Sequence, residues 1–140
     1  MKTAKELIEL IRAEVREAYF AMESGDADKM ADSASKLAMQ NFSLGSSIPD
    51  LQFEAESLDS VYKHHIAQSF AENKDAGYTD KLSDSNARLK WKEMQEQCIS
   101  KSRDYRLAKN AHDDTNTLID VLRTNISIKK QQLNKLGGQV

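Results

Sequence analysis

The chain has 140 residues, of which 30% are charged and 39% hydrophobic, and its formal net charge at pH 7 is −2. That length fits one domain, and the composition is too apolar for a disordered chain and too charged for a membrane-embedded one. Only five glycines and one proline occur. Because these residues are the strongest helix breakers, their scarcity predicts an all-α protein.

The single cysteine, Cys98, excludes an internal disulfide framework. The N-terminus lacks the apolar core of a signal peptide, and no segment reaches the ~20 apolar residues that a membrane span requires. We therefore expect a cytoplasmic protein without a membrane partner.

Charge is distributed unevenly along the chain. Residues 1–80 contain 8 basic and 15 acidic residues, a balance of −7, whereas residues 81–140 contain 12 basic and 7 acidic residues, a balance of +5. This asymmetry favours head-to-tail self-association, or a polyanionic partner for the basic part.

Three helices are predicted before residue 76. Thr3 and Glu6 form a capping-box pattern, which predicts that the first helix starts near Ala4 and is ended by Gly25. Apolar residues at helical spacing predict its inward face, which contains Ile8, Ile11, Val15, Ala18 and Met22.

Asp26 or Asp28 can cap a second, shorter helix, and residues 1–45 would then form an N-terminal helical pair. The inward face of the second helix is predicted to contain Met30, Ala34, Leu37, Ala38 and Phe42. The sequence Gly-Ser-Ser-Ile-Pro at 45–49 predicts a loop, and Pro49 suits the first position of a third helix that extends to about Asp75. The inward face of the third helix is predicted to contain Leu51, Ala55, Leu58, Tyr62, His65 and Ser69.

Residues 78–136 contain no glycine or proline, which predicts one long C-terminal helix capped by Thr79, Asp80 or Ser83. A heptad pattern fits this helix. Its first core position is occupied by Trp91, Cys98, Tyr105, His112, Ile119, Ile126 and Leu133. Its second core position is occupied by Met94, Lys101, Ala108, Thr115, Leu122, Lys129 and Leu136. Residues 113–117 prefer turns, but the heptad phase is the same on both sides of them, which favours a continuous helix. Residues 50–136 would form an antiparallel hairpin within a single overall domain, followed by a tail at 137–140.

The length of this helix predicts self-association. About 55 residues of helix span roughly 80 Å, whereas a compact domain of this size has a radius of gyration near ~14 Å. A second apolar row on the helix also requires cover, and it contains Leu107, Ala111, Leu118, Val121 and Ile128. The expected fold is three shorter N-terminal helices plus one long coiled-coil-like helix, in an oligomeric helical bundle. The predicted oligomer interface comprises Trp91, Met94, Cys98, Tyr105, Ala108, Ile119, Leu122, Ile126 and Leu133.

The sequence contains no phosphate-binding glycine loop, paired-cysteine zinc motif or His-Glu-x-x-His motif. We therefore predict a non-enzymatic protein with no cofactor and no metal. His112 is interpreted as a polar residue that sets helix register, and Cys98 as a packed, unreactive thiol.

Basic residues of the long helix are candidates for neutralising phosphates. The predicted nucleic-acid-binding residues are Arg88, Arg103, Arg106, Lys109, Arg123 and Lys130. Four of them share one heptad position that contains no acidic residue, and such a one-sided row suits a nucleic-acid backbone. The alternative is a solvated face, or pairing across an oligomer with acidic residues such as Glu54, Glu56 and Asp59.

Short segments of residues 78–136 also carry a family resemblance. They are Tyr78-Thr79-Asp80, Ala87-Arg88, Tyr105-Arg106-Leu107-Ala108-Lys109 and Leu122-Arg123 with Ile126-Ser127. In these segments the chain resembles small helical bacteriophage proteins of recombination and replication gene clusters, of the recombination-mediator type. The resemblance covers less than half of the chain. It implies a ring-forming protein that helps to load a recombinase on single-stranded DNA, and it assigns binding to Arg88, Arg106, Lys109 and Arg123.

The expected function is therefore that of an oligomeric accessory factor of phage DNA recombination or replication in the host cytoplasm. Its expected partners are further copies of itself and single-stranded DNA, a recombinase or a single-strand-binding protein. The alternatives are a phage-encoded inhibitor of a host defence complex and a structural coiled-coil scaffold. The acidic first part favours the inhibitor, because acidic helical proteins can occupy the nucleic-acid groove of a partner.

Overall fold

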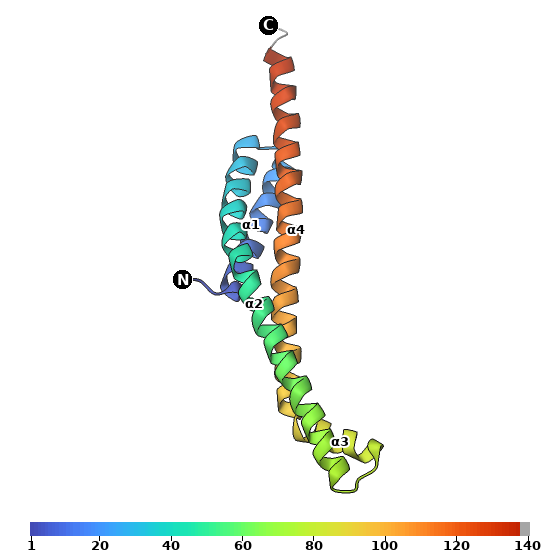
Figure 1. Cartoon of the computed structure of the whole chain (residues 1–140). Coiled ribbons are helices and arrows are strands. Elements are labelled where there is room, and N and C mark those ends of the chain that lie inside the picture. The colour runs from blue at the N-terminus through green and yellow to red at the C-terminus, as the bar shows by residue number, and fades with distance from the viewer. Residues whose placement is uncertain (138–140) are drawn as a thin grey trace. The chain divides into compact units, whose positions relative to one another are not determined.

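The computed structural model describes residues 1–137, and within that range the protein is all-helical (Figure 1). Four helices follow one another: α1 (Ala4–Ser24), α2 (Ala27–Asp75), α3 (Asp80–Lys90) and α4 (Lys92–Gly137). The all-α prediction with a long last helix is confirmed. Gly137, predicted to begin the tail, is the last residue of α4, and the rest of that tail lies outside the described residues.

The first helix has the predicted bounds because both of its ends are determined locally. The Thr3 hydroxyl accepts a hydrogen bond from the Glu6 amide, and the Glu6 carboxylate accepts one from the Thr3 amide. Gly25 ends the helix at φ +66°, a left-handed conformation that glycine adopts without the steric cost of a Cβ.

The second helix passes without interruption through the segment that was predicted to be a loop, so the loop at 45–49 and the separate third helix are wrong. Ser46 and Ser47 donate their hydroxyls to the carbonyls of Phe42 and Leu44, and Pro49 lies inside the helix. Leu44 is fully buried, and the glycine beside it makes room for a side chain of α4. Tertiary packing here outweighs the local preference of glycine and proline for a break.

The predicted C-terminal helix is instead divided in two at Trp91. Thr79 caps α3, as the sequence allowed, and Trp91 ends it with φ −108° and ψ 22°. The indole Nε1 of Trp91 donates a hydrogen bond to the Ser69 hydroxyl on α2 (2.8 Å), and its ring stacks on His65 with 4.1 Å between the centroids. These contacts hold the side chain on α2 where the helix breaks. No break occurs at 113–117, so the continuity predicted there is confirmed.

The described residues form two compact units, and the first contains residues 1–48 and 108–137. In this unit α1, the first half of α2 and the second half of α4 surround a shared core. The fully or nearly fully buried apolar residues of that core are Leu7, Ile11, Ala18, Ala21, Met30, Ala34, Leu37, Leu44, Ala108, Ile119 and Leu122. The inward faces predicted for the first two helices are confirmed in part: Ile11, Ala18, Met30, Ala34 and Leu37 are buried, Ile8, Val15, Met22 and Ala38 are half-buried, and Phe42 is 79% exposed.

The second unit contains residues 49–107 and has a thin core. Its buried residues are all small, namely Ala55, Ser69, Ser83 and Ala87. The larger side chains predicted to face inward on α2 are only half-buried. Because stabilisation by burial scales with apolar area, this unit contributes less to stability than the first.

Candidate interaction surfaces

Part of the predicted oligomer interface is already covered by the chain itself. Ala108 and Leu122 are completely buried and Ile119 is 5% exposed, all within the first unit. These three residues pack against the protein's own helices and leave no surface for a second copy, which corrects their assignment to an interface. The heptad pattern predicted which side of α4 is buried at these three residues. That side is covered by α1 and α2 of the same chain and not by the predicted second copy.

The other predicted interface residues remain partly or largely accessible. Five of them are half-buried: Trp91, Met94, Cys98, Tyr105 and Ile126. Leu133 is 55% exposed, and Leu136, in the other core position of the heptad, is 65% exposed. The buried seam of α4 therefore becomes an exposed apolar surface near its C-terminal end.

The second apolar row predicted on α4 is accessible to solvent in the first unit. Val121 is 43% exposed and Ile128 is 48% exposed, while Ala111 and Leu118 are half-buried. An apolar row on a helix surface is typical of a site that another protein covers.

A polar cluster connects α2 and α4 in the first unit. The Asn41 amide donates hydrogen bonds to the His112 carbonyl (3.1 Å) and to Asn116 Oδ1 (2.9 Å). Nδ1 of His112 lies 3.1 Å from Asn41 Oδ1 and 3.2 Å from its carbonyl oxygen. Since both neighbours are acceptors, Nδ1 of His112 is the donor in these contacts. His112 thus has polar partners in its own chain.

Cys98 lies half-buried on α4 in the second unit. Burial, and secondarily the negative charge of Asp59, raise the pKa of its thiol above the ordinary value. A raised pKa keeps the group as a thiol near neutral pH, which is unfavourable for nucleophilic chemistry.

The predicted nucleic-acid-binding residues do not form one uniform row. Arg88 lies on α3, separated by the break at Trp91 from the heptad register of α4, and its guanidinium pairs with Asp84 at 3.0 Å. That ion pair raises the pKa of Arg88 further above its ordinary value. Arg123 lies 4.0 Å from Asp120 on the same helix. An exposed pair of this kind is worth little energetically, but it places a negative charge beside each guanidinium.

The remaining basic candidates are exposed and have no carboxylate within 4.0 Å among residues 1–137: Arg103, Arg106, Lys109 and Lys130. Arg103 and Arg106 belong to the second unit, and Lys109 and Lys130 belong to the first. Arg106 also donates a long hydrogen bond to the carbonyl of Ser102.

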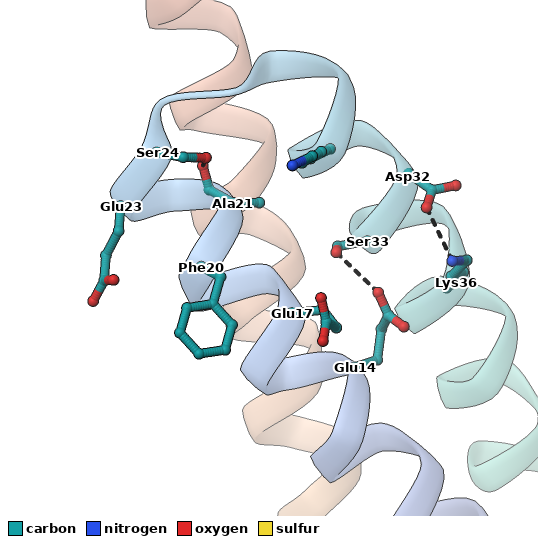
Figure 2. Close-up of a pocket in the computed structure, with 10 residues that line it drawn as sticks. Glu14, Glu17, Phe20, Ala21, Glu23, Ser24, Asp32, Ser33 and Lys36 are labelled. Atoms are coloured by element: carbon teal, nitrogen blue, oxygen red, sulfur yellow. Dashed lines mark hydrogen bonds and ion pairs between the residues drawn. The ribbon is translucent and has the colours of Figure 1, made fainter.

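An acidic groove between α1 and α2 was not predicted from the sequence (Figure 2). It has a volume of about 780 Å³, and the carboxylates that line it are Glu14, Glu17, Glu23 and Asp32. Ser33 donates a hydrogen bond to Glu14 (2.9 Å), and Lys36 pairs with Asp32 (3.0 Å). The sequence signal was the acidic bias of residues 1–80, but only the packing of α1 on α2 brings these carboxylates together.

The carboxylates of the groove also change the pKa of Lys36, which lines it. The pKa of Lys36 is raised first by its hydrogen bond and charge interaction with Asp32, and then by the charges of Glu14 and Glu17. An exposed aromatic ring, that of Phe20 at 64%, lies in the same groove. The groove thus offers negative charge and an apolar contact together.

Within residues 1–137, no three His, Cys, Asp or Glu side chains are grouped closely enough to hold a metal ion. No helix in that range is long and apolar enough to cross a membrane. Comparison with known proteins finds no matching protein-family model, curated protein or solved structure.

Proposed function

We propose that this protein is a non-enzymatic accessory factor of phage DNA recombination or replication that acts by binding other proteins. It associates with itself and binds the proteins that coat single-stranded DNA. The observation that carries this proposal is the exposed apolar surface of α4, because Val121, Ile128, Leu133 and Leu136 are each more than 40% exposed on one helix. Apolar side chains left exposed to water are costly, and a helix that carries several of them is typical of a site that contacts another protein.

The placement of charge supports a protein partner over a bare strand. Arg88 and Arg123 each have a carboxylate beside them. The aromatic rings most exposed on the described residues, those of Phe20, Phe42 and Phe53, are on α1 and α2. None of these rings shares a helix with the basic candidates, whereas binding of single strands usually combines stacking rings with basic residues.

The test is fluorescence anisotropy with a labelled oligo-dT strand, either bare or coated with a purified single-strand-binding protein. We expect the full-length protein to bind the coated strand at physiological salt and to bind the bare strand much more weakly. Equal binding to both strands would contradict a protein-directed function. No binding to either strand would contradict the accessory role altogether.

Direct binding to single-stranded DNA is the second candidate, and the unpaired charges of Arg103 and Arg106 favour it. Binding to the bare strand should then fall steeply with salt, because each neutralised phosphate releases counterions. The variant Arg103→Glu/Arg106→Glu should weaken it by at least about tenfold at 50 mM salt. Lys2→Glu/Lys5→Glu makes the same change in net charge at the other end of the sequence, and it should leave binding nearly unchanged.

A further inference from the structure

Among residues 1–137, no other helix covers the C-terminal end of α4. Lys129 Nζ lies 3.4 Å from the position that a Cβ on Gly25 would occupy, so α4 passes the α1–α2 turn at this residue. Residues 130–137 continue as helix beyond that turn (Figure 1). We call these eight residues the α4 tail. Within it, Leu133 is 55% exposed and Leu136 is 65% exposed.

The leucines of the tail continue the buried face of α4. Leu133 follows the buried Ile119 by two heptads, and Leu136 follows the buried Leu122 by two heptads. Residues two heptads apart have nearly the same direction around a helix. The tail therefore turns its leucines to the same side as the residues that α1 and α2 cover, but no helix of the described part of the chain lies on that side of the tail.

The tail is also basic. From Val121 to Gly137 the helix has no acidic residue. The four basic residues of this stretch, from Val121 to Gly137, are Arg123, Lys129, Lys130 and Lys135. A partner surface must therefore offer an apolar contact for two leucines and negative charge for the lysines of the tail.

The acidic groove of the same molecule offers both: the exposed ring of Phe20 gives an apolar contact, and the four carboxylates outnumber the two lysines, Lys29 and Lys36, that also line it. Figure 2 shows it opening on one side of α1 and α2, while α4 passes behind them. Along α1 the groove extends from Glu14 to Ser24, ending just before the turn. This stretch of helix is about 16 Å long, which is enough for the eight-residue tail of about 12 Å. The tail cannot reach the groove of its own chain, because it continues straight past the turn and away from the groove.

We propose that two copies of the chain form an antiparallel dimer in which the α4 tail of each copy lies in the α1–α2 groove of the other. The two α1–α2 turns then meet end to end between the two α4 helices. Each tail directs Leu133 and Leu136 toward the exposed ring of Phe20 of the second copy, with its lysines beside the carboxylates of the groove. The contact is the same in both directions, so the assembly closes at two copies.

This inference rests on the self-association contained in the proposed function and specifies its surface. The test is the mass of the full chain in solution by light scattering coupled to gel filtration, at tens of micromolar protein. We expect twice the chain mass of 15.8 kDa. The variant Leu133→Asp/Leu136→Asp should weaken dimerisation by at least tenfold, as should Glu17→Lys/Glu23→Lys from the groove side. Far-UV circular dichroism shows whether each variant remains helical.

A charge exchange makes the test specific. Lys130→Glu/Lys135→Glu should dissociate the dimer, and combining it with Glu17→Lys/Glu23→Lys should restore at least part of the affinity. Leu89→Asp/Ile99→Asp, which changes two exposed apolar residues of the second unit, is the matched control and should leave the mass unchanged. A monomeric wild type, an assembly larger than two copies, or a dimer that tolerates both the tail and the groove variants would overturn the inference.

The outcome is separable from that of the proposed function. A monomeric protein that still binds the coated strand would refute the dimer alone. A dimer that depends on the tail but ignores the coated strand would refute the accessory role and leave the dimer in place.

Discussion

Gly45 should be more stabilising than alanine at its position, although it lies in the middle of a helix. A Cβ at this residue would lie 2.7 Å from Cε1 of the His112 imidazole, far inside van der Waals contact. The ring could move away only by breaking the contacts of its Nδ1 with Asn41, which is 2% exposed and fully engaged with α4. Gly45→Ala therefore tests whether packing between the helices outweighs helix propensity.

The opposing magnitudes can be compared directly. Alanine is favoured over glycine inside a helix by roughly 0.5–1 kcal/mol. Overpacking a tight contact costs about 1–3 kcal/mol, and a buried amide left without its partner costs about 1–3 kcal/mol. We therefore expect Gly45→Ala to lower the free energy of unfolding by about 1–3 kcal/mol, which corresponds to a fall in Tm of about 4 °C per kcal/mol.

The assay is urea unfolding followed by far-UV circular dichroism at one fixed protein concentration, since self-association would make stability depend on concentration. The control is the same substitution in a His112→Ala background, where the Cβ has room and the helix propensity of alanine should make it stabilising. The coupling energy between the two sites should be about 2–3 kcal/mol. If Gly45→Ala stabilises the protein even when His112 is present, the steric argument is wrong.

Four further predictions concern other parts of the chain. Thr3→Ala removes the cap of α1 and should destabilise the protein by about 0.5–2 kcal/mol in the same urea assay, whereas an unchanged midpoint would mean that the cap contributes nothing. Because the second unit buries only small side chains, the fluorescence of Trp91, the single tryptophan, should change at lower urea than the far-UV signal; coincident transitions would contradict this. Cys98, whose pKa is raised by burial and by Asp59, should react with iodoacetamide at neutral pH more slowly than a free cysteine, and Asp59→Asn should speed the reaction. The raised pKa of Cys98 also predicts how stability depends on pH. The stabilisation from the protonated thiol is present below the pKa of the unfolded state and is lost as pH rises through the pKa of the folded state. A free energy of unfolding that increases over this alkaline range would contradict the prediction.

The acidic groove illustrates how far sequence reasoning could reach toward the candidate site. The acidic bias of residues 1–80 was visible, and so were the leucines and lysines near the end of α4. The sequence could not show that Glu17 and Asp32 line one groove, because these residues are on different helices whose packing angle and register depend on the whole core. The same holds for Asn41, whose hydrogen-bond partners, His112 and Asn116, are 71 and 75 residues away in the sequence.

The features that the sequence determined by itself are those with local causes. The ends of α1 follow from a capping box and a left-handed glycine, whose interactions span only a few residues. The apolar phase of α4 follows from a repeat that any helix would present on one side, so Ile119 and Leu122 were expected to be buried; α1 and α2 of the same chain, and not the predicted second copy, bury them. Tertiary structure alone decided the continuity of α2 through Gly45 and the break of the last helix at Trp91. Each of these depends on a side chain from a distant part of the chain, His112 in one case and Ser69 in the other, whose contacts outweigh the local conformational preference.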